Sequence, residues 1–421
     1  MSMWMRFKGK VKEQMPALES VSFRIYFVGQ TVSRVGSWFA KVAQQWLIYP
    51  VLTNRQELLG VVSAVQLVPS ALLMVFGGVV ADRVDKRKFV IWLQLVFAII
   101  STVLAWLIFT GNIQVWHVMG AALVTGILFA LDVPIRKAML FELVEKKNFP
   151  SALALETGSY NVSRALGPAV AGFLIAVVGI SAAYLLDAIS FLVVSGMLVF
   201  MSVPYLVKPV VASKSMKSDL MGGFEFVWER KVLVVLLMFT FLNSVFTWPK
   251  ATLMPVLVHD VYGAGEIGFG LLNAVFGLGA TVAAVFFNGL YHRSENKHGL
   301  LMLAFGVTIV MLLGLAINRF FLIALVLEFF SGWGVATVNV LIATLIQTNS
   351  PGNLRGRISS IYYFVMTGAM PVGALLGSVG VKAIGVAGTI AVCGVLLAIS
   401  LVVVLGVTWA KLPVKMRELA G

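Results

Sequence analysis

Long apolar runs alternate with short polar interruptions along almost the whole chain. Each run has about 20 residues, the length that an α-helix needs to cross ~30 Å of hydrocarbon. The pattern predicts twelve membrane-spanning helices, at residues 23–51, 58–80, 89–109, 116–140, 152–178, 181–203, 232–256, 267–290, 300–317, 320–346, 358–381 and 387–410. We therefore expect an all-α membrane protein.

Composition favours the same class and excludes several others. Apolar residues make up 60% of the 421 residues and charged residues only 12%, whereas about 25% of a typical soluble protein is charged. The single cysteine, Cys393, excludes an internal disulfide. The chain has neither a G-x-x-x-x-G-K-[ST] phosphate loop nor an H-E-x-x-H motif, so we predict no ATP hydrolysis, no metal site, no cofactor and no enzyme activity.

The net charge of +14 is concentrated in alternate loops. If the helices zigzag across a membrane, one side receives most of the basic residues, including the tail around Arg6 and the loop around Lys86. The other side receives only Arg55, Arg319 and Lys382. Loops rich in Lys and Arg stay in the cytoplasm, so both termini are predicted to be cytoplasmic. The charge then serves orientation and contact with anionic phospholipids, and we predict no nucleic-acid binding.

A long polar interruption, residues 208–231, divides the predicted helices into two sets of six. We predict a basic cytoplasmic tail (1–22), a six-helix bundle (23–205), a central cytoplasmic loop (206–231), a second six-helix bundle (232–410) and a cytoplasmic tail (411–421). The segment around Asp82 has a diverged counterpart around His292, and Gly167-Pro168 has one at Met370-Pro371. Internal repeats of this kind are typical of secondary transporters, whose binding site lies near the middle of the bilayer.

Two motifs indicate which kind of membrane protein this is. The loop between predicted helices 2 and 3 combines a glycine with dense charge, at Gly78, Asp82, Arg83, Asp85, Lys86 and Arg87. Predicted helices 4 and 5 carry Asp132-x-Pro134-x-Arg136 and Asn161-x-x-Arg164-x-x-Gly167-Pro168-x-x-Ala171-Gly172. The first motif resembles the signature of the major facilitator superfamily, which commonly has glycine in place of Asp85. The second resembles the enterobactin-exporter and macrolide-efflux branch of that superfamily, and the resemblance covers essentially the whole chain.

The resemblance implies a role for each motif. In the superfamily, the aspartate corresponding to Asp82 contacts neighbouring helix ends and stabilises the outward-facing state, with Arg83 and Arg87 as ionic partners or phospholipid contacts. The simpler interpretation is a basic loop that only sets topology, although topology alone does not require an aspartate. The Gly167-Pro168 motif is found in exporters rather than importers. Its simpler interpretation is a kinked, tightly packed helix.

Charged side chains inside the predicted helices cost about 2.5–3.5 kcal/mol each to insert, so each should face a partner or a water-filled cavity. They are Arg34, Lys41, Asp132, Glu156, Arg164, Asp187, Lys250 and Glu328. Asp132 and Arg164 lie at matching depth on either side of the helix 4–5 hairpin, so we predict that they pair. A structural ion pair is the preferred interpretation, because a nearby cation keeps a carboxylate ionised, and a proton carrier is the alternative.

Glu328 is the leading candidate for proton coupling. It lies in an apolar run of predicted helix 10, and helices 1, 4, 7 and 10 line the cavity in the superfamily that the chain resembles. A carboxylate buried among apolar side chains can bind a proton near neutral pH. The alternative is an ion pair with Lys250 or Lys41. Asp187 is a second, more peripheral candidate.

Several polar side chains on predicted helices 1, 7 and 10 are candidates for the wall of a substrate cavity. They are Gln30, Ser33, Gln44, Asn243, Thr247 and Asn339. Such a wall has few polar groups, and the chain is rich in Phe and Met, with 29 and 18 residues. This combination suits a large amphipathic molecule better than a sugar or an ion.

Together these features predict a transporter of the bacterial inner membrane that exports a drug- or macrolide-like amphipathic compound by proton antiport with alternating access. A siderophore exporter with the same mechanism is the nearest alternative. A non-transporting receptor or a lipid scramblase is the alternative from another class. The predicted partners are a small amphipathic substrate, protons and anionic phospholipids, and the chain is expected to act as a monomer.

Overall fold

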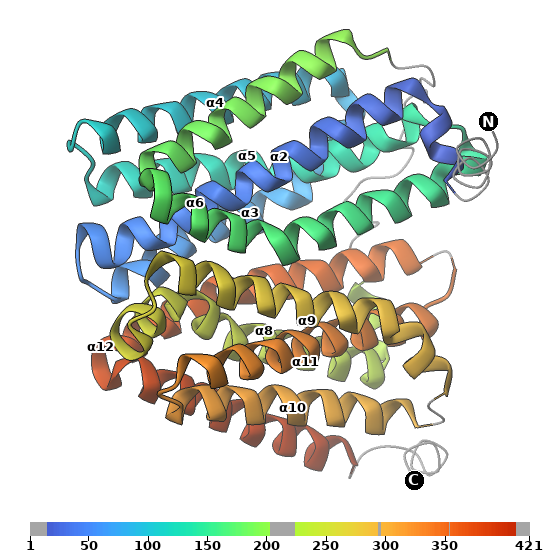
Figure 1. Cartoon of the computed structure of the whole chain (residues 1–421). Helices are drawn as coiled ribbons and strands as arrows, with labels where there is room; N and C mark the ends of the chain where they lie inside the picture. Colours follow the sequence, from blue (N-terminus) through green and yellow to red (C-terminus); the bar gives the residue numbers. More distant parts are fainter. Residues whose placement is uncertain (1–14, 203–223, 294–295, 353, 410–421) are drawn as a thin grey trace, which may run out of the picture. The chain divides into compact units, whose positions relative to one another are not determined.

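The computed structural model describes residues 15–202, 224–293, 296–352 and 354–409, and all regular secondary structure in these ranges is helical (Figure 1). The long helices are α2 (Val21–Trp46), α3 (Glu57–Arg83), α4 (Lys86–Phe109), α5 (Val115–Leu143), α6 (Phe149–Phe200), α8 (Lys231–Val256), α9 (Gly265–Arg293), α10 (Lys297–Ile317), α11 (Phe321–Thr348) and α12 (Arg355–Trp409). Short helical turns are η1 (Pro16–Glu19), η2 (Leu47–Leu52), η3 (Lys146–Asn148) and η4 (Leu257–Tyr262). The predicted all-α class is confirmed.

Two of these helices are each long enough to cross a membrane twice, and each is interrupted by a glycine. In α6, Gly179 has φ 85° and ψ 170°, and in α12, Gly385 has φ 72° and ψ 174°. Only glycine adopts this conformation readily, because it has no Cβ. The break in α6 lies between predicted helices 5 and 6, and the break in α12 lies between predicted helices 11 and 12.

Within the described residues, nine helical segments are long and apolar enough to span a membrane. The segments that contain α6 and α12 count once each among the nine, although each is interrupted by its glycine. Helix α2 is not among them, and it carries Arg24, Arg34 and Lys41. Its 26 residues are nevertheless sufficient to cross the hydrocarbon layer.

The helices form two compact units. Unit 1 contains the described residues up to Leu47 and residues 69–202, and unit 2 contains residues 48–68 and the described residues from 224 onward. The division falls inside α3, immediately before Pro69. The beginning of α3 packs on α12, where Ser378 Oγ donates to the carbonyl oxygen of Glu57 at 2.7 Å. The domain boundaries expected near residues 205 and 232 stay predictions, and the first of them falls among residues 203–223, outside the described part.

In unit 1, α2 lies along both halves of α6 (Figure 1). Thr31 contacts Ser159, and Trp38 contacts Gly167, so α2 runs parallel to the first half of α6. Its contacts with the second half run in the opposite order: Gly29 packs on Val194, and Gly36 packs on Ser190. Helix α4 packs on this second half through the stacked rings of Phe97 and Phe191.

In unit 2, α8 packs on α12, and α11 packs on both α9 and α10. The backbones of α9 and α11 touch at two glycines. A Cβ on Gly279 would lie 1.9 Å from the carbonyl oxygen of Phe329, and one on Gly332 would lie 2.0 Å from that of Phe276. Small residues allow this close approach in membrane helices, and it brings the side chains of α8, α9 and α11 together at the site described below.

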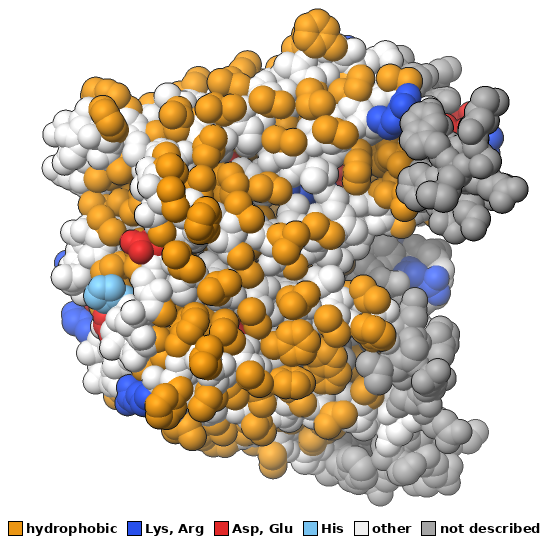
Figure 2. All heavy atoms as spheres, in the orientation of Figure 1, with side chains coloured by type: hydrophobic (Ala, Val, Ile, Leu, Met, Phe, Trp, Pro, Cys, Tyr) orange, Lys and Arg blue, Asp and Glu red, His pale blue; other side chains and the backbone are white. Residues whose placement is uncertain are grey.

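The outer surface of the helices is strongly apolar. Large apolar side chains such as Phe109, Phe200 and Trp116 are exposed, and hydrophobic side chains cover much of the face in Figure 2. A water-soluble monomer rarely exposes a large contiguous apolar area. This surface is the one expected of helices that face lipid.

Candidate functional site

A buried ion pair joins α8 and α11 inside unit 2. Lys250 Nζ lies 2.6 Å from Glu328 Oε2, and the exposed fractions of the two side chains are 4% and 0%. The same ammonium donates to Ser331 Oγ at 3.1 Å and lies 4.3 Å from the centre of the Phe276 ring. Of the two partners considered for Glu328 in the sequence, Lys250 is therefore the one that binds it.

The pair leaves one carboxylate oxygen unused, because Glu328 Oε1 is buried without a hydrogen-bond partner. Removing two charges from water costs several kcal/mol per ion, and removing either partner of such a pair is more costly than losing both. The carboxylate and the ammonium therefore depend on each other, while the free oxygen leaves the carboxylate able to accept a proton. Whether it does so during transport stays a prediction.

Two of the predicted cavity residues meet between the same two helices, α8 and α11. Asn243 of α8 donates to the side-chain oxygen of Asn339 of α11 at 3.3 Å, and Tyr362 donates to the backbone oxygen of Asn339 at 3.1 Å. The hydroxyl of Thr247 instead donates to the carbonyl oxygen of Asn243 in its own helix, at 2.6 Å. The same two helices thus share a buried ion pair and a buried amide contact.

In unit 1, the carboxylate of Asp132 is held by a residue of its own helix. Arg136 Nε donates to both oxygens of Asp132 at 2.6 and 2.7 Å, and Arg136 also donates to the side-chain oxygen of Gln30. The predicted pairing of Asp132 with Arg164 is wrong. Arg136 lies one helical turn after Asp132 on the same face of α5, so its guanidinium reaches the carboxylate within one helix.

A second ion pair in unit 1 connects α2 with α6. Arg34 lies 2.5 Å from Glu156 Oε2 and donates to Ser159 Oγ at 3.1 Å, and Thr31 lies 2.8 Å from the same hydroxyl. The remaining predicted cavity residues of α2 differ in exposure, since Ser33 is buried and Gln44 is half-buried.

Asp187 differs from the other buried acids. Its Oδ2 accepts from Ser101 at 2.7 Å, whereas its Oδ1 is buried without a partner. Within the described part of the chain it makes no salt bridge, although only 2% of its surface is exposed. The side chain of Gln94, on the same helix as Ser101, is fully buried and its two amide atoms have no hydrogen-bond partner.

The predicted exporter motif lies in the first half of α6. Gly167, Pro168 and Gly172 are buried, and Asn161 and Arg164 are half-buried. A Cβ on Gly167 would lie 2.6 Å from two ring atoms of Trp38, so the absence of a side chain at Gly167 is what makes room for that indole. Close packing, the simpler interpretation of this motif, is thus observed, and its link with export stays a prediction.

The charged loop between α3 and α4 binds neighbouring helix ends. Asp85 caps α4 by accepting from the backbone N–H of Lys88 at 3.1 Å, and Lys86 pairs with Glu142 of α5 at 2.7 Å. Arg87 donates to the last carbonyl groups of α6, at 2.8 Å for Leu198. Arg83 is exposed. The surroundings of Gly78 and Asp82 lie outside the described residues, so the role expected for Asp82 stays a prediction.

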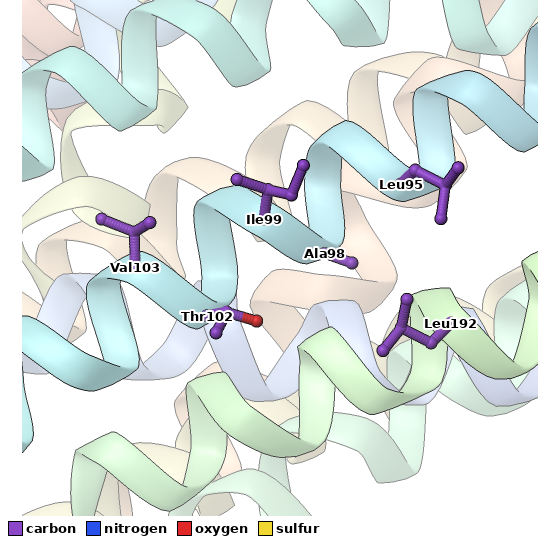
Figure 3. A pocket seen from close by; sticks show the side chains of 6 residues that line it. All are labelled: Leu95, Ala98, Ile99, Thr102, Val103 and Leu192. Atoms are coloured by element: carbon purple, nitrogen blue, oxygen red, sulfur yellow. The ribbon is translucent and has the colours of Figure 1, made fainter.

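An apolar groove lies on the surface of unit 1 between α4 and α6 (Figure 3). It has a volume of about 390 Å³ and is lined by Leu95, Ala98, Ile99, Thr102, Val103 and Leu192. None of the predicted cavity residues lines it. In the described ranges as a whole, no three His, Cys, Asp or Glu side chains converge as a metal site would require.

Sequence comparison identifies the family. A sequence model described as transmembrane secretion effector, a family of the major facilitator superfamily, matches residues 14–418. The chain belongs to this family. It is therefore a multi-pass membrane protein of a transporter family, as the sequence motifs predicted.

The chain is similar to known transporters, and the similarity extends along most of both sequences. The staphyloferrin A transporter of Staphylococcus aureus is 26% identical over 88% of this chain and 92% of its own. Macrolide efflux protein A of Streptococcus pyogenes is 24% identical over 89% and 94%. The enterobactin exporter EntS of Shigella boydii is 27% identical over 85% of each chain.

Solved structures show the same fold at much lower identity. The nucleoside transporter NupG matches with a TM-score of 0.68 at 11% identity, over 92% of this chain and 98% of its own. A bacterial homologue of the human lysosomal transporter Spinster, in an inward-facing and unoccupied conformation, matches with a TM-score of 0.68 at 11% identity, over 91% and 95%. These likenesses concern the fold alone.

Several contacts of the candidate site and of the charged loop were not predicted from the sequence. Ser331 and Phe276 contact Lys250, and Glu142 pairs with Lys86. A serine or phenylalanine in an apolar run carries no signal of its own. Glu142 lies just beyond the predicted end of helix 4, so only the true length of α5 reveals its depth.

Proposed function

We propose that the protein is a secondary active exporter of an amphipathic organic compound, driven by proton antiport. In this proposal, twelve spans form two six-helix bundles with both termini in the cytoplasm of a bacterium, and α2 is the first span. The protein acts as a monomer, without a cofactor, in the inner membrane. Support comes from the transporter family, from relatives named as a siderophore transporter, a siderophore exporter and a macrolide efflux protein, and from basic loops that alternate with apolar spans.

The observation that carries the proton-coupling proposal is the Lys250–Glu328 pair. Protonation of Glu328 would cancel one charge of a pair that is buried from solvent. It would therefore weaken the electrostatic attraction that holds α8 and α11 together. A ligand shifts a conformational equilibrium by its differential affinity for the two states. If Glu328 binds a proton only in the conformation in which its pair with Lys250 is broken, proton binding would favour that conformation. It would therefore drive one of the two conformational changes of an alternating-access cycle.

The relatives suggest two substrate classes, and both are to be tested. A macrolide-like compound suits the apolar composition of the helices, and a siderophore is the alternative that two of the three named relatives represent. A receptor or scramblase would need no buried ion pairs between spans.

The test uses purified protein in liposomes that enclose a pH-sensitive dye. Because substrate enters as protons leave, adding a transported macrolide or siderophore outside should raise the luminal pH. Glu328→Gln should lose this pH change, and Lys382→Ala, which removes an exposed charge, should keep it. Transport without any pH change would contradict proton coupling, and an undiminished pH change in Glu328→Gln would exclude Glu328 as the coupling residue.

A further inference from the structure

The ammonium of Lys250 is surrounded by groups that suit any organic ammonium ion. Glu328 Oε2 lies 2.6 Å from it, Ser331 Oγ accepts a hydrogen bond from it at 3.1 Å, and the centre of the Phe276 ring lies 4.3 Å away. A carboxylate, a hydroxyl oxygen and an aromatic face are all groups that attract an ammonium ion. We call Glu328, Ser331 and Phe276 the ammonium cage.

The ammonium cage is built on two helices that pack tightly on each other and does not need α8. Glu328 and Ser331 lie one turn apart on α11, and Phe276 lies on α9. A Cβ on Gly332 would lie 2.0 Å from the carbonyl oxygen of Phe276, so the two backbones touch at the residue that carries the ring. This contact fixes the height of the ring beside the carboxylate and the hydroxyl.

The occupant of the cage, Lys250, comes from a helix that packs mainly elsewhere. Helix α8 packs far more extensively on α12 than on α11, whereas α11 packs extensively on α9. The ion pair is therefore one of the few links between α8 and the cage. A lysine side chain is also long and flexible, so Lys250 can leave while α9 and α11 stay packed.

The cage offers one more acceptor than Lys250 uses. Glu328 Oε1 is buried and has no hydrogen-bond partner among the described residues. Buried polar groups in proteins are nearly always satisfied, so an unused carboxylate oxygen requires an explanation. A ligand that carries a second donor, such as a hydroxyl beside its amine, would satisfy this oxygen.

We propose that the ammonium cage binds the amine of an amphipathic substrate, and that the ammonium of Lys250 is a tethered competitor for the same place. The inference rests on the proposed export function and narrows the substrate to organic cations. In this structure the cage is closed, since the exposed fraction of the Glu328 side chain is 0%. The substrate enters when α8 moves away from α11, and its amine then donates to Glu328 and Ser331 and faces the ring of Phe276.

Binding of two matched probes tests the proposal. The probes are phenylbutylamine, a cation at neutral pH, and phenylbutanol, which has the same apolar skeleton without the charge. Both are titrated into the full chain in phosphatidylcholine nanodiscs, with empty nanodiscs as the blank. Wild type should bind the amine more tightly than the alcohol. Lys250→Met removes the tethered competitor, so it should tighten amine binding about tenfold or more and leave alcohol binding unchanged. Loss of a purely structural partner would give no such gain.

Further variants separate the cage from general effects on structure. The double variant Lys250→Met with Glu328→Leu lacks both buried charges, so it should fold and bind the amine no better than the alcohol. Lys382→Ala, which removes an exposed lysine, should change neither affinity. If Lys250→Met is too unstable to titrate, its melting temperature is the readout, and the amine should raise it whereas the alcohol should not.

The proposal is overturned if wild type binds both probes equally, or if Lys250→Met neither binds the amine more tightly nor is stabilised by it. If wild type transports an uncharged or anionic compound in liposomes and does not prefer the amine, the export function stands and this inference fails. If it transports no compound of any charge but prefers the amine, the proposed function fails and the cage is still an ammonium site.

Discussion

At the scale of single residues, the membrane interior makes each buried charge depend on its partner. Sequence alone located these charges, because each interrupts an apolar run, and it supplied the correct partner for Glu328 as one of two alternatives. It failed for Asp132, whose partner Arg136 is four residues away. Depth estimates place residues to within a helical turn at best, whereas the choice between Arg136 and Arg164 depends on side-chain direction around α5.

The Lys250–Glu328 pair predicts strong coupling between two substitutions. Lys250→Met or Glu328→Leu alone should destabilise the protein by about 3–5 kcal/mol, since each leaves a buried unpaired charge. The double variant should recover most of that loss, because two apolar side chains of similar volume replace the pair. Thermal unfolding in detergent measures this. Additive losses in the double variant would show that the two charges do not depend on each other.

Asp187 and Asp132 should respond differently to the same change. Asp187→Asn keeps the volume and the acceptor for Ser101 and breaks no ion pair in the described structure, so the melting temperature should stay close to that of wild type. Asp132→Asn leaves the buried Arg136 without its counter-charge, and the melting temperature should fall by several degrees. Equal losses in the two variants would contradict this account of Asp187.

At the scale of elements, the lengths of the apolar runs and the positions of glycines predicted most of the helix boundaries. The expected gap after residue 178 contains the break at Gly179, and the gap after residue 381 contains that at Gly385. The predicted first helix ran to residue 51, whereas α2 ends at Trp46 and the non-helical Tyr49 follows. Contacts between helices, such as the glycine approach of α9 and α11, could not be predicted because they depend on helix rotation.

That approach predicts a position-specific cost for adding one methyl group. Gly279→Ala places its Cβ against the carbonyl oxygen of Phe329, so α9 and α11 must separate, at a cost of about 1–3 kcal/mol. Gly306→Ala is the matched control, because nothing lies within 4 Å of its Cβ in α10 and alanine favours a helix. Thermal unfolding compares the two. A stable Gly279→Ala variant would mean that the helices are not in contact there.

At the scale of the whole molecule, each unit carries its own ion pairs between or within helices: Arg34–Glu156, which is half-buried, and Asp132–Arg136 in one, and the buried Lys250–Glu328 in the other. Family membership makes the chain a transporter-type protein. The energy source and the substrate are proposals, because they depend on how charges and helices rearrange during a cycle rather than on run lengths and motifs.

The central claim is that a proton gradient drives transport, and accumulation in liposomes tests it directly. Liposomes with an acidic lumen and neutral exterior receive labelled macrolide or siderophore at equal concentration on both sides. The account predicts that substrate accumulates in the lumen above the external concentration, and that a protonophore abolishes the accumulation. Substrate that only equilibrates, with or without the gradient, would contradict the account and indicate a passive facilitator.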